Sequence, residues 1–297
     1  MYPGGFHYHR AASVEEASTM LLELGDEAKL LAGGQSLIPL MKLRFANPRH
    51  LVDLGFIRGL AFIKEEGNSL CFGPMTRHAE IAHSSLVSKV PILRDCAAGI
   101  ADVQVRNRGT IGGSIAEADP SGDWANVLLT LDTQIRIANA RGERILALKD
   151  FITDAYTTAL DHDELITEIL VRVPARNSGG AYLAFKRTAP VYPTASVAVQ
   201  LVMEGDLCTD AAVVLGCVGL TPVKAREAAA AIRGKQINAK SLIAAAEASR
   251  AEADPQPDMR GSADYKRTMI AALTRRAIEA AAARARGKQI EVSHSYA

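Results

Sequence analysis

The 297-residue sequence has only four cysteines and almost no net charge. Cys71, Cys96, Cys208 and Cys217 are scattered and form no C-x-x-C pair, so the sequence predicts buried, reduced thiols of a cytosolic protein and argues against a disulfide framework or a metal site. The formal net charge of +1 argues against a dedicated nucleic-acid-binding protein, which would carry a clear basic excess.

Long apolar runs are also missing. No segment approaches the ~20 apolar residues that a membrane-spanning helix needs. The first residues lack the basic region and apolar run of a secretory signal, so we expect a cytoplasmic protein without a membrane span. The apolar content of 48% and the length of 297 residues allow two or three domains with substantial cores.

Basic residues gather late in the chain. On a helix such residues predict a solvated face, with a partner surface as the alternative. The residues are Arg267, Arg275, Arg276, Arg284, Arg286 and Lys288.

The common nucleotide and catalytic motifs do not occur. No G-x-G-x-x-G opens a helix, and there is no Walker loop, H-E-x-x-H, calcium loop or convincing nucleophile triad. The sequence has instead two short glycine loops, at residues 31–36 (Leu-Ala-Gly-Gly-Gln-Ser) and 108–114 (Arg-Gly-Thr-Ile-Gly-Gly-Ser). Either loop alone predicts no more than a tight turn.

Together the two glycine loops predict a pyrophosphate site. Glycine lets the backbone approach an anion closely, and successive N–H groups can form a concave nest for phosphate oxygens. Ser36, Thr110 and Ser114 add hydroxyl donors, and Asp123 suits the hydroxyls of a ribose or ribityl chain. A third glycine pair, in residues 177–180, lacks a following hydroxyl or carboxylate and predicts a linker turn. We infer a bound cofactor that does the chemistry while the protein positions it.

Residues 1–55 are predicted to form a compact β-α-β unit. Ser13, with Glu16 three residues on, predicts the start of a helix. Short strands are predicted at 29–32 and 50–54. The first glycine loop therefore follows a strand, at the carboxyl end where α/β folds bind ligands.

The rest of the chain predicts two further units, at 56–176 and 177–290, and a tail at 291–297. Strands backed by alanine-rich helices in the last unit favour an α+β layer. The elements of the second unit are a hairpin around 66–68, a helix at 77–84 capped by Thr76, helices from Pro91 and at 124–131, and strands at 134–138 and 165–171. Those of the third are strands at 181–187, 195–203 and 210–218, helices at 223–233, 239–251 and 263–286, a Ser262 cap and a mobile loop at 252–261.

The two glycine loops and the Ser-Gly-Asp of residues 121–123 resemble the flavin subunit of the molybdenum hydroxylases. These are the relatives of xanthine dehydrogenase and carbon monoxide dehydrogenase with separate small, medium and large subunits. The resemblance covers nearly the full length and includes residues 185–187 and 262–267. It implies an α+β fold, with a two-part FAD-binding domain of the vanillyl-alcohol-oxidase (PCMH) type. A C-terminal domain like that of the CO dehydrogenase flavoprotein follows, with a three-stranded antiparallel sheet and helices.

The resemblance also implies which residues bind FAD. Asp123 would bind a hydroxyl of FAD, Lys186 would lie near the isoalloxazine ring with Tyr192 beside it, and Ile166 or Ile169 would supply an apolar wall. The loop residues that would wrap the pyrophosphate are Ala32, Gly33, Gly34, Gln35, Ser36, Thr110, Ile111, Gly112, Gly113 and Ser114.

Two loop positions depart from the family pattern, and two assignments have alternatives. Gln35 stands where some relatives have His, and Ser114 where many have Asn, but both keep hydrogen-bonding ability. Without the resemblance, Lys186 could be a surface lysine and Tyr192 a packing aromatic at a Pro-rich turn.

The implied function is electron transfer by an FAD-carrying subunit of a heterotrimeric molybdenum hydroxylase. Electrons would come from the [2Fe-2S] clusters of a small partner subunit, after substrate oxidation at the molybdenum cofactor of a large one, and leave to an external acceptor. We expect a dimer of heterotrimers, with those metal groups only in the partners and no metal or catalytic residue in this chain. One alternative is a stand-alone FAD oxidoreductase with His78, His83 or His162 as base. The other is a scaffold without cofactor, which the intact loops disfavour.

Overall fold

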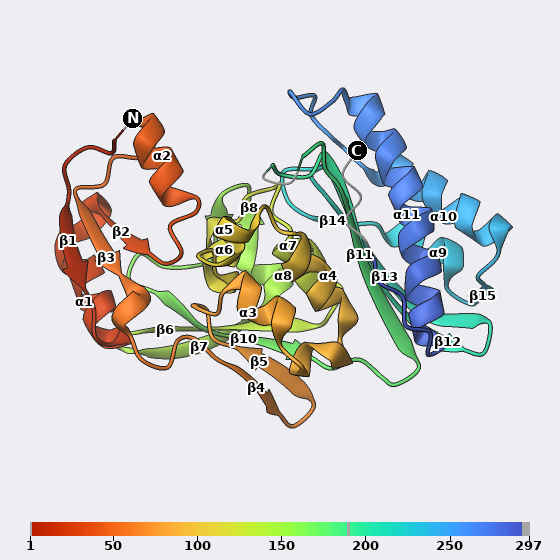
Figure 1. Cartoon of the computed structure of the whole chain (residues 1–297), viewed down its shortest axis with the longest axis horizontal. Helices are drawn as coiled ribbons and strands as arrows, with labels where there is room; N and C mark the ends of the chain where they lie inside the picture. Colours follow the sequence, from red (N-terminus) through yellow and green to blue (C-terminus); the bar gives the residue numbers. More distant parts are fainter. Residues whose placement is uncertain (1, 189–190, 293–297) are drawn as a thin grey trace.

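The computed structural model describes residues 2–188 and 191–292. Three main sheets lie side by side along the long axis of the molecule, at residues 7–53, 63–172 and 178–236 (Figure 1). This arrangement confirms the predicted α+β class. The unit boundaries at 55/56 and 176/177 stay predictions. No helix in the described ranges has the length and apolar character needed to cross a membrane.

The first sheet has three parallel strands in the order β1-β3-β2. Ser13 caps α1 as predicted, because its Oγ accepts the N–H of Glu16 at 3.1 Å. The carboxyl end of β2 leads into the first glycine loop, and α2 follows that loop. The elements are β1 (His7–Arg10), α1 (Val14–Leu24), β2 (Ala28–Leu31), α2 (Leu37–Leu43) and β3 (His50–Asp53), with short 3-10 turns at Gly25–Glu27 and Leu54–Phe56.

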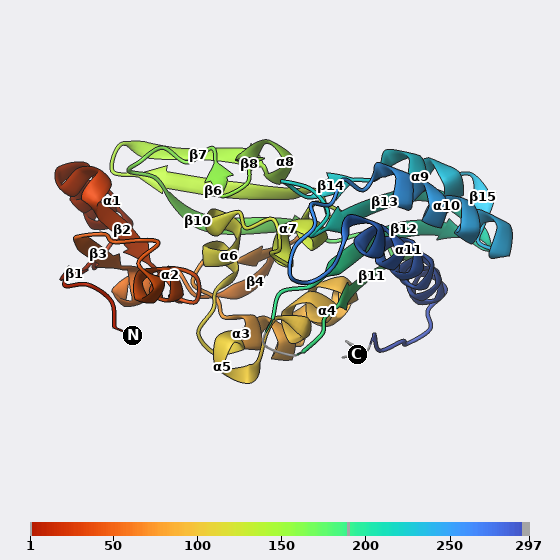
Figure 2. The same ribbon diagram turned by 90° about the horizontal axis from the view of Figure 1, so that it is seen from above.

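The second sheet is antiparallel, in the order β4-β5-β10-β6-β7. Its long β6–β7 hairpin extends back to the first unit, where the N–H of Ala140 donates to Ser18 Oγ on α1 at 3.0 Å (Figure 2). The strands are β4 (Ile63–Glu66), β5 (Ser69–Phe72), β6 (Thr133–Asn139), β7 (Gly142–Ala147), β10 (Leu165–Arg172) and the separate pair β8 (Ile152–Asp154) and β9 (Thr157–Thr158). The helices are α3 (His78–His83), α4 (Pro91–Gly99), α5 (Val103–Arg106), α6 (Ile111–Glu117), α7 (Trp124–Leu128) and α8 (Leu148–Phe151), with a 3-10 turn at Leu86–Lys89.

The prediction that Thr76 caps α3 is wrong. Thr76 Oγ1 hydrogen-bonds both the N–H and the C=O of Phe62, so it ties two loop segments together. Arg77 is the cap residue of α3, and its N–H donates to Glu80 Oε2 at 2.7 Å. The competing partner, Phe62, is distant in sequence, which is why the local pattern misleads.

The third sheet is buried on both faces. Along β11, Ala181 and Leu183 face the C-terminal helices, whereas Tyr182 and Ala184 join the core of the middle unit. Figure 1 shows α4 on one side of β11 and α11 on the other. Double burial explains the nearly continuous apolar strands. The elements are β11 (Ser178–Phe185), β12 (Ala195–Glu204), β13 (Leu207–Gly216), β14 (Val223–Lys224), β15 (Lys235–Gln236), α9 (Arg226–Ile232), α10 (Ala239–Glu252) and α11 (Ala263–Ala285).

Two sequence predictions fail in this third unit. The glycine pair at 179–180 lies inside β11 and is not a linker turn. Glycine is needed at 179 because a Cβ there would be 2.1 Å from the Ala281 carbonyl oxygen of α11. The late basic residues are not one solvated face: the Arg284 side chain is only 7% exposed and forms a two-pronged ion pair with Asp95 of α4, at 2.5 and 2.9 Å. The Arg284–Asp95 ion pair joins the C-terminal helix α11 to α4.

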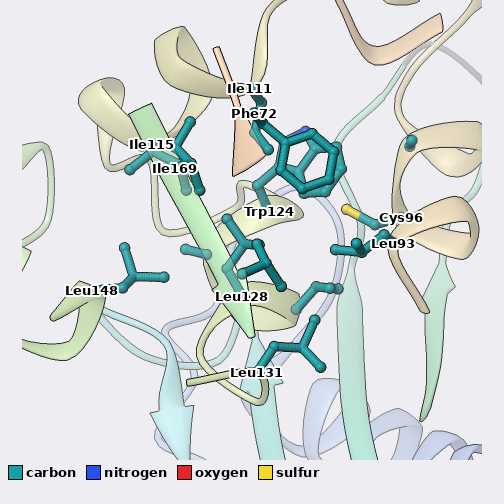
Figure 3. Packing of buried hydrophobic residues seen from close by; sticks show 14 of the residues in the cluster. Phe72, Leu93, Cys96, Ile111, Ile115, Trp124, Leu128, Leu131, Leu148 and Ile169 are labelled. Atoms are coloured by element: carbon teal, nitrogen blue, oxygen red, sulfur yellow. The ribbon is translucent and has the colours of Figure 1, made fainter. Parts of the chain in front are cut away.

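The largest core cluster lies between the second and third sheets. Figure 3 shows Phe72, Ile111 and Trp124 packed together within it. Ile169 of β10 belongs to the same cluster and is fully buried.

Candidate functional site

The two glycine loops meet in space. A Cβ on Gly33 would lie 2.3 Å from the carbonyl oxygen of Arg108 and 2.8 Å from the Cα of Gly109. A Cβ on Gly113 would lie 3.6 Å from the Cβ of Ala32. The first loop can therefore touch the second only because residue 33 has no side chain.

The first loop offers free backbone donors. Gly34 has a φ of +72°, in the left-handed region that favours glycine. The N–H groups of Gly34, Gln35 and Ser36 have no hydrogen-bond partner within the part of the chain that the structure describes. They lie in the turn that leads into α2, and successive free N–H groups of this kind can bind an anion.

The second loop differs from the prediction, because the N–H groups of residues 111–114 have partners inside the protein. Those of Ile111 and Gly112 donate to backbone carbonyls of the segment before α3, at 3.0 and 2.9 Å. Those of Gly113 and Ser114 donate to Oγ1 and the carbonyl oxygen of Thr110, both at 3.1 Å. What remains for a ligand is the backbone N–H of Thr110, which has no partner among the described residues, with the hydroxyl proton of Thr110 and the hydroxyl of Ser114.

A cavity of about 1000 Å³ opens at the two loops. This volume is at the upper end of the range for ligand sites. Ile111 and Ile169 do not line the cavity, because both lie in the core. The predicted site residues that do line it are Ala32, Gly33, Gly34, Gln35, Ser36, Thr110, Gly112, Gly113, Ser114, Asp123, Ile166, Lys186 and Tyr192.

Asp123 and Lys186 form a buried polar group at one part of this cavity. The Asp123 carboxylate accepts the hydroxyl proton of Tyr182 at 2.6 Å, and Lys186 Nζ lies 3.7 Å away. Lys186 Nζ also donates to the carbonyl oxygen of Gly99 at 2.6 Å. Because Lys186 is only 1% exposed, it is not the surface lysine of the alternative interpretation. Burial and the Asp123 charge raise the pKa of Tyr182, so its hydroxyl stays a donor.

Tyr192 lies on the cavity rim and is 46% exposed. Tyr156, Glu117 and Asp119 line the same cavity. Burial and the nearby Asp119 carboxylate raise the pKa of both tyrosines, so both phenols are neutral. Tyr156 has a φ of +55°, which is unusual for a non-glycine residue and is not visible in the sequence.

The segment expected to be a mobile loop is tied to this rim. Arg260 donates to Ser121 Oγ at 3.1 Å and to the Pro193 carbonyl oxygen at 3.5 Å. Arg260 also pairs with Asp258 at 2.8 Å, and buried Lys266 pairs with the same carboxylate at 3.0 Å. Desolvation favours the neutral acid, but Lys266 and Arg260 outweigh it and lower the pKa of Asp258 to about 2. No sequence signal indicated this strap.

Of the three candidate histidine bases, His78 and His162 line the cavity and His83 does not. His83 is exposed at the end of α3, and the ring of His162 contacts the Leu21 carbonyl oxygen at 2.9 Å. His78 is buried in the cavity wall, where Nδ1 accepts the indole N–H of Trp124 at 3.1 Å. Burial, with a smaller contribution from the Arg106 charge, lowers the pKa of His78 to about 4.

A separate group of possible metal ligands, Glu66, Cys71 and Glu168, lies on the middle sheet. Glu168 is paired with Lys64 at 3.2 Å and with Arg136 at 3.0 Å. Lys64 also pairs with Glu66 at 2.7 Å. Two cations therefore already balance this carboxylate pair.

The cavity fits a dinucleotide such as FAD. Three free N–H groups on the first loop and the hydroxyls of the second loop, brought together by the close approach at Gly33, suit a pyrophosphate. Residues 4–175 match the family model of the FAD binding domain in molybdopterin dehydrogenase. Residues 180–281 match that of the CO dehydrogenase flavoprotein C-terminal domain.

Known proteins resemble the chain over nearly its whole length. The carbon monoxide dehydrogenase medium chain of Afipia carboxidovorans is 42% identical over 96% of this chain and 100% of its own. The solved carbon monoxide dehydrogenase of Hydrogenophaga pseudoflava that lacks the Mo-pyranopterin moiety of the molybdenum cofactor matches with a TM-score of 0.93. It is 40% identical and covers 96% of this chain and 99% of its own. Quinoline 2-oxidoreductase from Pseudomonas putida 86 matches with a TM-score of 0.91 and 32% identity, over 96% of this chain and 99% of its own.

The chain belongs to the family of FAD-binding flavoprotein subunits of the molybdenum hydroxylases. This confirms the resemblance carried by the two glycine loops.

Proposed function

We propose that this chain is the FAD-carrying electron-transfer subunit of a heterotrimeric molybdenum hydroxylase. The observation that carries the proposal is the contact between Gly33 and the second loop beside a cavity, in a chain that matches a carbon monoxide dehydrogenase medium chain over 96% of its length. When bound, FAD would supply a carrier that accepts electrons singly and releases them in pairs.

The chain's own residues would hold and orient the cofactor. The N–H groups of Gly34, Gln35 and Ser36, with the hydroxyls of Thr110 and Ser114, would bind the pyrophosphate. No lysine or arginine is among these five residues, so backbone N–H dipoles and hydroxyls would stabilise the negative charge of the pyrophosphate.

The other predicted residues would act beside the loops. Asp123 keeps one carboxylate oxygen for a hydroxyl of FAD, since Tyr182 uses the other. Buried Lys186 would place a positive charge near the isoalloxazine ring, Tyr192 would cover the ring at the rim, and Ile166 would supply the apolar wall.

We also propose the partners that the family implies. They are a small [2Fe-2S] subunit and a large molybdopterin subunit, assembled as a dimer of heterotrimers. The chain is similar to the medium chain of one carbon monoxide dehydrogenase. It is also similar to a solved carbon monoxide dehydrogenase that lacks the Mo-pyranopterin moiety of its molybdenum cofactor, and both similarities support this assignment. We propose a cytoplasmic location because all four cysteines are free and three are buried, as suits a reducing compartment.

The test is to purify the tagged chain with whatever chains accompany it. The proposal predicts a yellow preparation that contains one FAD per copy of this chain, with two co-purifying chains that carry iron–sulfur and molybdenum. A colourless chain that takes up no FAD under any condition would defeat it. Substrate oxidation by the isolated chain would favour the stand-alone oxidoreductase.

A further inference from the structure

His78 lies directly against the start of the second glycine loop. Its backbone N–H donates to the Gly109 carbonyl oxygen at 3.1 Å. A Cβ on Gly109 would be 2.7 Å from His78 Nε2, so only glycine leaves room for the imidazole. The ring therefore lies at the start of the second glycine loop.

The hydrogen bond from Trp124 decides which ring nitrogen carries the proton. An indole N–H can only donate, so Nδ1 of His78 must be the acceptor in the 3.1 Å contact. A neutral imidazole has one N–H, and here that N–H is at Nε2. The low pKa of His78, about 4, agrees with a neutral ring at physiological pH.

The Nε2 proton has no acceptor among the described residues. Nε2 nevertheless keeps some contact with solvent. Among the described residues, the buried side-chain atoms that have neither a partner nor contact with solvent are Asn126 Oδ1, Asp163 Oδ2, Ser249 Oγ and Thr274 Oγ1. His78 as a whole is only 5% exposed and lines the cavity. The accessible part of Nε2 therefore opens into the cavity, as a donor that awaits an acceptor.

We propose that His78 is a cofactor-binding residue whose Nε2–H donates a hydrogen bond to an oxygen of FAD at the start of the second glycine loop. Trp124 is the positioning residue that fixes the tautomer. The inference rests on the proposed FAD function and adds a contact to it.

The first test measures FAD affinity for the full chain by quenching of flavin fluorescence. His83→Leu is the matched control, since His83 is an exposed residue on the same helix. His78→Leu is expected to weaken FAD binding about tenfold or more relative to His83→Leu, as for a lost hydrogen bond to a charged acceptor. Equal affinity of the two variants would overturn the assignment of His78 and leave the FAD function standing. Failure of the wild-type chain to bind FAD would defeat the proposed function, and this inference with it.

A second test needs no substitution and remains decisive if His78→Leu does not fold. The seven histidines are labelled with ¹⁵N, and the His78 ring is identified by its proximity to the indole N–H of Trp124, the one tryptophan in the chain. We expect the Nε2–H tautomer before and after FAD addition, and a shift of the Nε2 proton on binding. A proton on Nδ1, or an unchanged Nε2 signal at saturating FAD, would overturn the proposal.

The role of Trp124 has its own readout. Trp124→Phe removes the indole donor and keeps an aromatic ring, so the same ¹⁵N experiment is expected to show a mixture of His78 tautomers. A pure Nε2–H form in this variant would contradict the positioning role of Trp124.

Discussion

A Cβ on Gly33 would lie 2.8 Å from the Cα of Gly109, so two loops far apart in the sequence are in direct backbone contact. Each loop alone is an ordinary turn. Their contact places free N–H groups of the first loop and hydroxyls of the second around one cavity. The first of four predictions concerns Gly33, and the others concern Arg284, Arg260 and His78.

Gly33→Ala is expected to separate the loops. The added methyl group would sit 2.3 Å from the Arg108 carbonyl oxygen, and backbone cannot yield as a flexible side chain can. We expect a stability loss of about 1–3 kcal/mol, as for overpacking, and loss of FAD binding in titration. Gly142→Ala is the control, because its Cβ would meet open space. Unchanged FAD affinity in Gly33→Ala would contradict the loop contact.

Arg284 is expected to be a major stabilising residue in spite of its place in a basic cluster. Arg284→Met would leave the buried Asp95 carboxylate without its two-pronged partner, and removal of one member of a buried pair costs about 3–5 kcal/mol. Urea unfolding measures this loss. Arg275→Ala, an exposed change on the same helix, should stay within about 0.5 kcal/mol. Similar midpoints for the two variants would contradict the role of the ion pair.

The Arg260 strap is expected to rigidify the cavity rim. Arg260→Ala removes contacts to Ser121 and Pro193 and one partner of Asp258, so we expect a loss of about 1–2 kcal/mol and faster hydrogen exchange at 119–123. Exposed Arg250→Ala is the control. Unchanged exchange at 119–123 would show that the strap does not hold the rim.

His78 is expected to make stability depend on pH below neutrality. Its pKa is about 4 in the folded chain against 6.5 when unfolded. The unfolded chain therefore binds a proton first as pH falls, and stability is lost between about pH 6.5 and 4. The loss amounts to about 3 kcal/mol for this shift. His78→Gln should show a flatter stability profile over that window, whereas His83→Gln should follow the wild type. Parallel profiles for all three would contradict the buried neutral ring.

The parts of the site that sequence could predict are local ones. Glycine pairs and nearby hydroxyls are readable as loops, and the caps at Ser13 and Ser262 were confirmed by their hydrogen bonds. What failed depends on partners distant in sequence. Thr76 hydrogen-bonds Phe62 in place of the helix end, and Gly179 lies in a strand that packs closely against α11.

The most consequential difference concerns the second loop. Its sequence suggests a nest, yet the N–H groups of Ile111 and Gly112 bond to carbonyls of residues 74–76, which only folding brings near, and those of Gly113 and Ser114 bond to Thr110. The same folding turns His78 from a candidate base of an alternative function into a buried donor beside that loop. Neither the bonding of the second loop to residues 74–76 nor the burial of His78 could be predicted from the spacing of residues.

The most direct measurement of the central claim compares FAD with riboflavin in calorimetric titrations of the full chain. Both ligands carry the same ring, but only FAD has the pyrophosphate that the two loops would grip. The account predicts one FAD bound per chain and riboflavin affinity weaker by a factor of about 100 or more, as expected when several charge-assisted hydrogen bonds are lost. Equal affinity for the two ligands, or no binding of FAD, would contradict it.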